Sequence, residues 1–204
     1  MNVVVTGVGH NLASMRFALS RLGIEAVFTD NPAIIQRAER VILPGVGTAR
    51  NAMASLQKAG LIEVIQNLTI PVLGVCVSMQ ILMTSSAEDE VQTLNIIPGK
   101  IERLMPEENY SVPHMGWNTL RNIEPASKIF KGINSGSYVY FVHSYALRKS
   151  HYAIAECGHG TQFTAAVRKD NFYGVQFHPE LSGEIGARVL KNFFEVNDEN
   201  NSSD

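Results

Sequence analysis

The chain has 204 residues, of which 45% are hydrophobic and 18% are charged, and its formal net charge is −2. These values are typical of a globular protein that can bury a substantial core, and the small net charge gives no reason to expect binding to nucleic acid or to an anionic membrane. No apolar run reaches the ~18 residues of a transmembrane helix, and no basic segment precedes the first apolar residues as in a secretory signal, so we expect a cytoplasmic location. The two cysteines, Cys76 and Cys157, support neither a disulfide framework nor a paired-cysteine metal site, and no metal is expected.

Strands and helices alternate through the first part of the chain. Short apolar runs predict strands at residues 2–6, 26–28 and 41–43, and helical apolar spacing predicts helices at 12–22, 32–37 and about 48–59, the last capped by Thr48. The glycines after the first strand lack the third glycine of a dinucleotide-binding loop, because Leu12 stands in its place. No nucleotide or other cofactor is therefore expected.

The third predicted strand runs into Pro44-Gly45-Val46-Gly47. Its two glycines permit backbone conformations that other residues avoid. The segment is either a tight strand-to-helix turn, which is the commoner case, or a flexible loop whose N–H groups face an oxyanion.

A thiol lies at the next strand-to-helix corner. Residues 71–75 are apolar and β-branched, as in a strand buried on both faces, and helical spacing begins at Val77. Such a corner raises Cys76 above the sheet edge and directs N–H groups of the helix start at its sulfur, and Gly74 and Ser78 are small enough to allow it. Taken alone, Cys76 is equally consistent with a nucleophile and with a small hydrophobic core residue. Cys157 is expected to be structural.

Beyond residue 85 the regular alternation stops. A strand is expected at residues 100–103, and aromatic and β-branched runs between 137 and 176 predict closely spaced, antiparallel strands. Trp117 lies in a proline- and glycine-flanked segment, where it is either a core residue or an anchor for a partner. Ser182 is the expected N-cap of a final helix. Because no linker divides the chain, we expect one domain over residues 1–196, followed by a polar, frayed tail at 197–204.

The sequence offers Cys76 a base and an orienting acid, as a nucleophilic cysteine requires. His178-Pro179-Glu180 follows the last predicted strand, and a residue before proline is extended, so His178 and Glu180 should point the same way. Residues that follow parallel strands converge at one edge of an open α/β sheet. The sequence therefore predicts a Cys-His-Glu triad. The alternatives are a structural strand-end histidine and a surface acid at a helix start.

Two motifs carry a resemblance to a known family. Gly74-Val75-Cys76-Val77-Ser78-Met79-Gln80 and Gln176-Phe177-His178-Pro179-Glu180 together resemble the class I glutamine amidotransferases, which hydrolyse glutamine through a thioester and pass on the ammonia. Within that family the chain is similar to the glutaminase subunits of imidazole glycerol phosphate synthase, from histidine biosynthesis. That likeness rests on four further segments: Pro44-Gly45-Val46-Gly47, Pro113-His114-Met115-Gly116-Trp117-Asn118, Tyr140-Phe141-Val142-His143-Ser144-Tyr145 and Leu190-Lys191-Asn192-Phe193-Phe194.

The resemblance implies a fold, a site and a partner. The fold would be an open, mostly parallel twisted sheet flanked by helices, flavodoxin-like, with additional antiparallel strands. Cys76 would attack glutamine, His178 would move the proton and Glu180 would orient His178. The partner would be a (β/α)8 cyclase that receives the ammonia, in a heterodimer. Residues implied in substrate or oxyanion binding are Gly45, Val46, Gly47, Val77, Gln80, His143, Ser144 and Tyr145, and those implied at the cyclase interface are Asn11, Met115, Trp117 and Asn118.

One residue departs from the family pattern, because Ser78 stands where glycine is usual. Its Cβ and hydroxyl are expected to crowd the glutamine site or perturb the thiolate, with activity surviving at a lower level. Three alternatives stay open: an amidotransferase serving another synthase, such as one in surface-sugar modification; a different cysteine hydrolase; and a catalytically silent scaffold.

Overall fold

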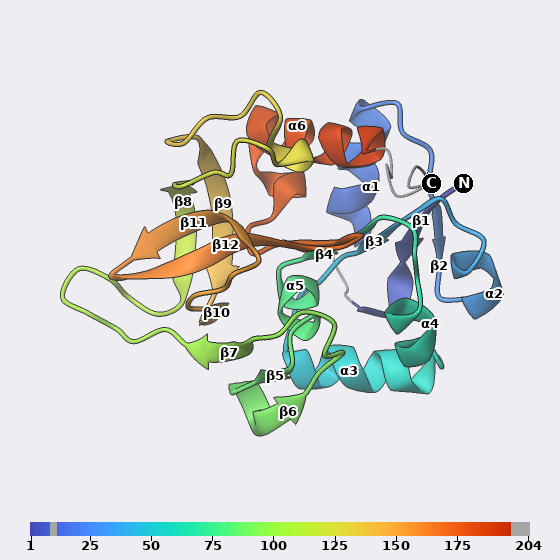
Figure 1. The fold of residues 1–204 in the computed structure, drawn as a ribbon, viewed down its shortest axis with the longest axis horizontal. Coiled ribbons are helices and arrows are strands. Elements are labelled where there is room, and N and C mark those ends of the chain that lie inside the picture. The colour runs from blue at the N-terminus through green and yellow to red at the C-terminus, as the bar shows by residue number, and fades with distance from the viewer. Residues whose placement is uncertain (9–11, 197–204) are drawn as a thin grey trace, which may run out of the picture.

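The computed structural model describes residues 1–8 and 12–196 and is built on one seven-stranded sheet (Figure 1). The strand order is β11-β12-β13-β4-β3-β1-β2, in which the last five are mutually parallel and the first two are antiparallel additions. The strands are β1 (Asn2–Val5), β2 (Val27–Thr29), β3 (Arg40–Leu43), β4 (Val72–Val75), β11 (Ala153–His159), β12 (Thr161–Lys169) and β13 (Phe172–Val175). The expected open, mostly parallel α/β sheet is confirmed.

Helices cover both faces of this sheet. Alternation along each strand explains the layers, because Val4 packs with α1 (Leu12–Arg21) and α6 (Gly183–Glu195), whereas Val3 and Val5 pack on the opposite face. That second face is covered by α3 (Ala49–Lys58), α4 (Ile62–Gln66) and α5 (Val77–Ile81), and α2 (Pro32–Ile35) lies between β2 and β3 in the chain. Burying each Val or Leu side chain contributes about 1.5–3 kcal/mol, so these two layers supply most of the stability.

Two smaller sheets extend from the antiparallel side. One contains β10 (Tyr145–Leu147), β7 (Lys100–Arg103), β5 (Ser85–Ser86) and β6 (Val91–Gln92), and the other pairs β8 (His114–Thr119) with β9 (Tyr138–His143). Short 3-10 helices are η1 (Thr6–Val8), η2 (Glu88–Glu90), η3 (Lys128–Phe130) and η4 (Pro179–Leu181). The β8–β9 pair lies beside the strand that ends at the candidate nucleophile, since the carbonyl oxygen of Val142 accepts a hydrogen bond from Cys76 Sγ at 3.7 Å.

Most predicted elements form close to their expected bounds. Thr48 caps α3, its hydroxyl accepting from the N–H of Asn51 at 3.2 Å, and the strand expected at 100–103 is β7. Ser182 is the N-cap residue of α6 as expected, but its side chain makes no capping hydrogen bond. Helix α4 and strand β8 were not predicted. Asn11 and the tail at 197–204 lie outside the described residues.

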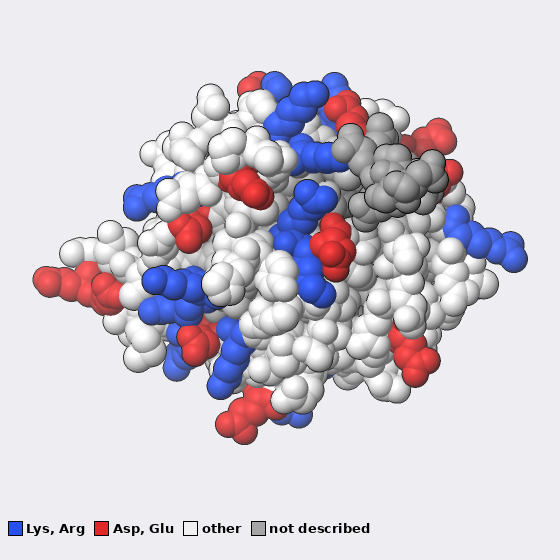
Figure 2. All heavy atoms as spheres, in the orientation of Figure 1, with Lys and Arg blue, Asp and Glu red and all other residues white. Residues whose placement is uncertain are grey.

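On the face drawn in Figure 2, Lys and Arg lie among Asp and Glu. Within the described ranges, no helix is long and apolar enough to cross a membrane.

Candidate active site

Three neighbouring parallel strands end at the same edge of the sheet and carry the predicted site. Strand β4 lies between β3 and β13, with Leu43 opposite Gly74 and Val175 opposite Val75. Cys76 directly follows β4, the Pro44–Gly47 segment follows β3, and His178 follows β13. Chain segments more than a hundred residues apart in sequence are therefore brought together, as the rule for open α/β sheets predicts.

The backbone at Cys76 is held in a conformation that only glycine adopts without strain. Its φ is 53° and its ψ is −112°, and such positions typically cost 1–3 kcal/mol, about as much as one hydrogen bond. The corner is tight: a Cβ on Gly74 would lie 2.8 Å from the carbonyl oxygen of Ser78 and 3.0 Å from the backbone nitrogen of Met79. This geometry is that of a nucleophile placed on a sharp strand-to-helix turn, which favours the nucleophile over the core-residue interpretation of Cys76.

His178 and Glu180 form a buried pair. His178 Nδ1 lies 2.9 Å from Glu180 Oε1, and the two side chains are only 6% and 5% exposed. Burial by itself lowers the pKa of His178, but hydrogen bonds to Cys76 and Glu180 and the charges of both raise it, with a net result of about 10. His178 is extended as expected, although Glu180 reaches it through the 3-10 turn η4 and not through an extended segment. The protonated imidazole is thus strongly favoured beside the sulfur.

The segment after β3 packs directly against the Cys76 corner. A Cβ on Gly45 would lie 2.6 Å from both the backbone nitrogen of Ser78 and the carbonyl oxygen of Val75, whereas Gly47 is exposed with φ +96°. The hydroxyl of Ser78 is fully buried and donates to the carbonyl oxygen of Pro44 at 2.7 Å. Ser78 therefore links this segment to α5. The expected effect of Ser78 on the glutamine site and on the thiolate stays a prediction.

The residues expected to bind glutamine gather around one backbone carbonyl. The oxygen of Tyr145 accepts from Gln80 Nε2 at 2.9 Å and lies 2.9 Å from His143 Nδ1. Ser144 is half-buried beside them, and its carbonyl accepts from the N–H of Leu104. Val46 is half-buried, and Val77, at the first position of α5, is buried. Both amide hydrogens of Gln80 are used, because its Nε2 also donates to Gln176 Oε1 at 3.0 Å.

An exposed apolar face lies on β8 and β9 next to this site. Met115 and Trp117 are 63% and 55% exposed, and they alternate with the buried His114 along β8. The rings of Trp117 and Tyr140, opposite each other in the pair, meet edge to face at 5.9 Å. Trp117 is therefore not a core residue. The side chain of Asn118 instead turns inward and donates to the carbonyl oxygen of Gly158 at 2.9 Å.

Two buried polar residues at the site were missed by the sequence analysis. Gln176 is fully buried, and its Nε2 donates to Cys76 Sγ at 3.7 Å. Ser182 Oγ donates to the carbonyl oxygen of His178 at 2.6 Å and accepts from the N–H of Tyr140 at 2.9 Å. Ser182 thus fixes the backbone of the histidine. Of the two, only Gln176 stands at a position that points to the site. It directly follows β13, as Cys76 directly follows the neighbouring parallel strand β4.

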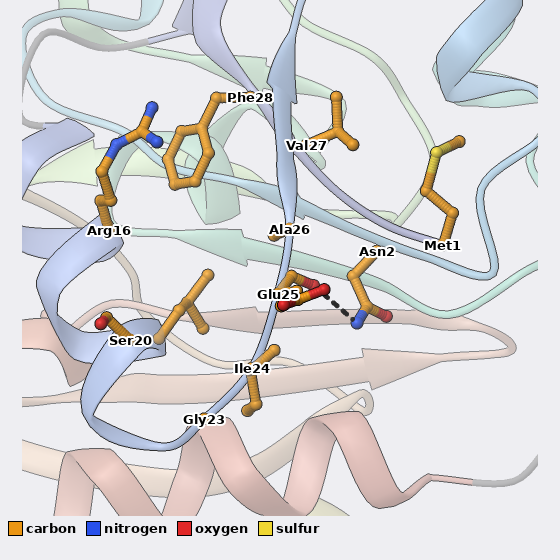
Figure 3. A pocket seen from close by; sticks show the side chains of 11 residues that line it. Met1, Asn2, Arg16, Ser20, Gly23, Ile24, Glu25, Ala26, Val27 and Phe28 are labelled. Atoms are coloured by element: carbon orange, nitrogen blue, oxygen red, sulfur yellow. Dashed lines mark hydrogen bonds between the residues drawn. The ribbon is translucent and has the colours of Figure 1, made fainter.

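A large surface cavity lies elsewhere and has no catalytic groups in reach. It measures about 900 Å³ and is formed by α1, β2 and the amino terminus (Figure 3). Arg16 stacks 4.0 Å over the ring of Phe28, and Asn2 Nδ2 donates to the carbonyl oxygen of Glu25 at 3.1 Å. Among the residues described, no group of three His, Cys, Asp or Glu side chains is arranged to hold a metal ion. The chemistry therefore belongs to the Cys76 edge of the sheet.

The fold and the cysteine, histidine and glutamate at one sheet edge define a class of protein. Residues 6–196 match the class I glutamine amidotransferases, and the chain belongs to that family. A solved glutamine amidotransferase that is 19% identical superposes with a TM-score of 0.74, covering 95% of this chain and 97% of that one, which shows the shared fold.

Two curated relatives indicate which group of this family the chain belongs to. Subunit HisH 2 of imidazole glycerol phosphate synthase from Legionella pneumophila (strain Lens) is 49% identical over 196 residues, covering 96% of this chain and 98% of the relative. Subunit HisH of the same synthase from Haemophilus influenzae (strain Rd) is 47% identical over 196 residues, with the same coverage of 96% and 98%. Within the class I glutamine amidotransferases, the chain belongs with the HisH subunits, and the resemblance found in the sequence is confirmed.

Proposed function

We propose that this chain is the glutaminase of imidazole glycerol phosphate synthase and that Cys76, His178 and Glu180 carry its reaction. The observation that supports this most is the buried His178–Glu180 pair at 2.9 Å beside a strained cysteine. Cys76 gives its proton to His178, and the resulting thiolate attacks the side-chain amide carbon of glutamine. The imidazolium, stabilised by Glu180, protonates the leaving nitrogen, and ammonia departs from a glutamyl thioester. Water deprotonated by His178 then hydrolyses the thioester to glutamate and frees the thiol.

Backbone N–H groups near the sulfur would stabilise the tetrahedral intermediate. We assign this role to Val77, at the start of α5, and to an N–H of the Gly45–Gly47 segment. The close approach of Gly45 to the corner supports this assignment. Loss of one such donor typically costs about 10²-fold or more in rate. Gln80 and the His143–Tyr145 segment would bind the amino-acid head group of glutamine.

The ammonia would pass to a (β/α)8 cyclase, which forms imidazole glycerol phosphate and an aminoimidazole carboxamide ribonucleotide. The exposed face of Met115 and Trp117 is the docking surface we assign to that subunit, with Asn118 supporting it through its bond to the carbonyl oxygen of Gly158. Aromatic and methionine side chains are enriched at such interfaces. We place the reaction in the cytoplasm, where free thiols such as Cys76 and Cys157 stay reduced.

The test is glutamate release by the chain with and without the cyclase. We expect slow hydrolysis by the chain alone and strong stimulation when the cyclase carries its own phosphoribosyl-formimino substrate. Turnover stimulated only by a different synthase and its acceptor would instead assign the chain to another pathway. No glutamate release in any combination would refute the glutaminase.

A further inference from the structure

Gln176 places a buried side-chain amide against the candidate nucleophile. It is fully buried, and its Nε2 lies 3.7 Å from Cys76 Sγ. This proximity follows from the sheet, because Val75 and Val175 are opposite each other and the N–H of Cys76 donates to the carbonyl oxygen of Val175 at 2.8 Å. An N–H group aimed at sulfur stabilises a thiolate far more than a thiol, since hydrogen bonds to charged acceptors are about twice as strong.

Neighbouring groups determine which end of the Gln176 amide faces the sulfur. A backbone carbonyl only accepts, so the Gln80 atom 2.9 Å from the oxygen of Tyr145 must be the nitrogen. The same Gln80 nitrogen lies 3.0 Å from Gln176, whose facing atom must then be the oxygen. The remaining end of the Gln176 amide is therefore the NH₂ group, and it faces the sulfur.

The carbonyl oxygen of Tyr145 also determines which ring nitrogens carry the protons in a pair of buried histidines. His143 Nδ1, 2.9 Å from the oxygen of Tyr145, must carry a proton, which leaves Nε2 as the acceptor of the neutral ring. His114 Nδ1 lies 2.9 Å from that nitrogen and must donate to it. His114 Nε2 then accepts from Asn118 Nδ2 at 3.1 Å. Burial lowers the pKa of His114 to about 4 and that of His143 to about 3, in keeping with two neutral rings.

A continuous chain of hydrogen bonds thus runs from strand β8 to the sulfur. Its members, in order, are Asn118, His114, His143, the carbonyl of Tyr145, Gln80, Gln176 and Cys76. Every donor in this series meets an acceptor, and the side chains of His114, His143, Gln80 and Gln176 are buried, so their bonds are costly to break. Strand β8 also carries the exposed Met115 and Trp117.

We propose that Gln176 is a further catalytic residue, whose amide donates to the sulfur of Cys76, and that the buried chain of bonds ending on β8 holds this amide in place. The proposal deepens the glutaminase assignment and rests on it. Gln176 stabilises the thiolate before attack and again when the thioester is hydrolysed. His114 and His143 are positioning residues, because the hydrogen bond from His143 Nδ1 helps to hold the carbonyl oxygen of Tyr145, on which the Gln80 amide is anchored.

The donor role is tested with two variants of Gln176 in the complex with the cyclase. Gln176→Met keeps the volume but removes the donor, and Gln176→Glu keeps the shape and the bond from Gln80 but turns an oxygen toward the sulfur. We expect kcat for glutamine to fall about 10-fold in the first and about 100-fold or more in the second, because bonds to charged groups are worth about 10- to 150-fold. Urea unfolding of both variants separates this from a purely structural role, in which kcat would fall only as far as the fraction of folded protein falls.

Alkylation of Cys76 by iodoacetamide gives an independent measure in the same variants. We expect the rate of alkylation at neutral pH to fall in both, further in Gln176→Glu, because the sulfur has lost the N–H that stabilises its negative charge. Cys157 does not interfere, because burial raises the pKa of its thiol to about 12, and Cys76→Ala gives the background. This assay needs no glutamine turnover, so a chain that alkylates as expected but never hydrolyses glutamine would refute the proposed function alone.

The relay is tested with His114→Phe, which keeps an aromatic ring against Phe141 but removes both nitrogens. We expect a fall in kcat of about 3- to 10-fold, and no further loss when it is added to Gln176→Met, as residues acting in series behave. His159→Phe is the matched control, because His159 also stacks on His114, at 4.1 Å, but lies outside the chain of bonds. Additive losses, or an unchanged alkylation rate in the Gln176 variants, would overturn the proposal.

Discussion

The pairing of His178 with Glu180 makes a quantitative prediction for Glu180→Gln. The change keeps the shape of the side chain and its contact with His178 Nδ1, which is 2.9 Å in the natural chain, but removes the negative charge. Because both side chains are at most 6% exposed, water cannot replace that charge. A buried charge-assisted bond is worth about 1.5–3 kcal/mol, so we expect kcat for glutamine hydrolysis to fall about 10- to 150-fold.

The same variant changes the titration of the histidine. Against the opposing effect of burial, Cys76 and Glu180 hold the pKa of His178 at about 10, and without the carboxylate it should fall toward its ordinary 6.5. A raised folded-state pKa contributes stability that is complete below 6.5 and is lost as the pH rises through about 10. The free energy of unfolding of the natural chain should therefore decrease across this window more steeply than that of Glu180→Gln.

Three measurements test these predictions for Glu180→Gln: steady-state kinetics of the complex, NMR titration of imidazole resonances, and urea unfolding from pH 6 to 10. Glu184→Gln is the control, since Glu184 is exposed and lies four residues further on. A kcat for Glu180→Gln within threefold of the natural value, or a His178 titration that does not move, would refute the reasoning.

Other predictions follow from the packing at the corner and on β8. Gly74→Ala should destabilise the chain by about 1–3 kcal/mol in urea unfolding and abolish turnover, because the added Cβ meets backbone atoms of α5. Gly7→Ala is the control and should unfold like the natural chain, because the nearest atom to its added Cβ is 3.9 Å away. Ser78→Ala should lower the free energy of unfolding by about 1–2 kcal/mol by leaving the carbonyl of Pro44 without its donor; equal stability would show that this bond contributes nothing. Trp117→Ala should weaken cyclase binding at least about 10-fold in calorimetry without changing the unfolding midpoint, and unchanged affinity would remove this face from the interface.

Much of the catalytic edge could be predicted from local sequence. The apolar run before Cys76 and the strand before His178 place both residues after parallel strands, and such strand ends converge whatever the rest of the fold. The proline after His178 correctly indicates an extended histidine. These signals depend only on short stretches of chain, so they can be read without knowledge of the tertiary structure.

The supporting residues could not be predicted, because their roles depend on distant pairing. Strand β8 was missed since Pro113 and Gly116 interrupt its pattern, and its pairing with β9 is what brings His114 to His143. Ser182 carries the sequence mark of a helix cap, yet tertiary contacts with Tyr140 and His178 take its hydroxyl instead. The positive φ of Cys76 is likewise a consequence of the whole corner and not of any residue preference.

The central claim is that Cys76 generates ammonia from glutamine for a second subunit. Its most direct test compares the natural chain with Cys76→Ala, each bound to the cyclase, with either glutamine or ammonium salts as nitrogen source. We predict that Cys76→Ala abolishes product formation from glutamine and leaves formation from ammonia unchanged. Glutamine-dependent product formation that persists in Cys76→Ala would contradict it.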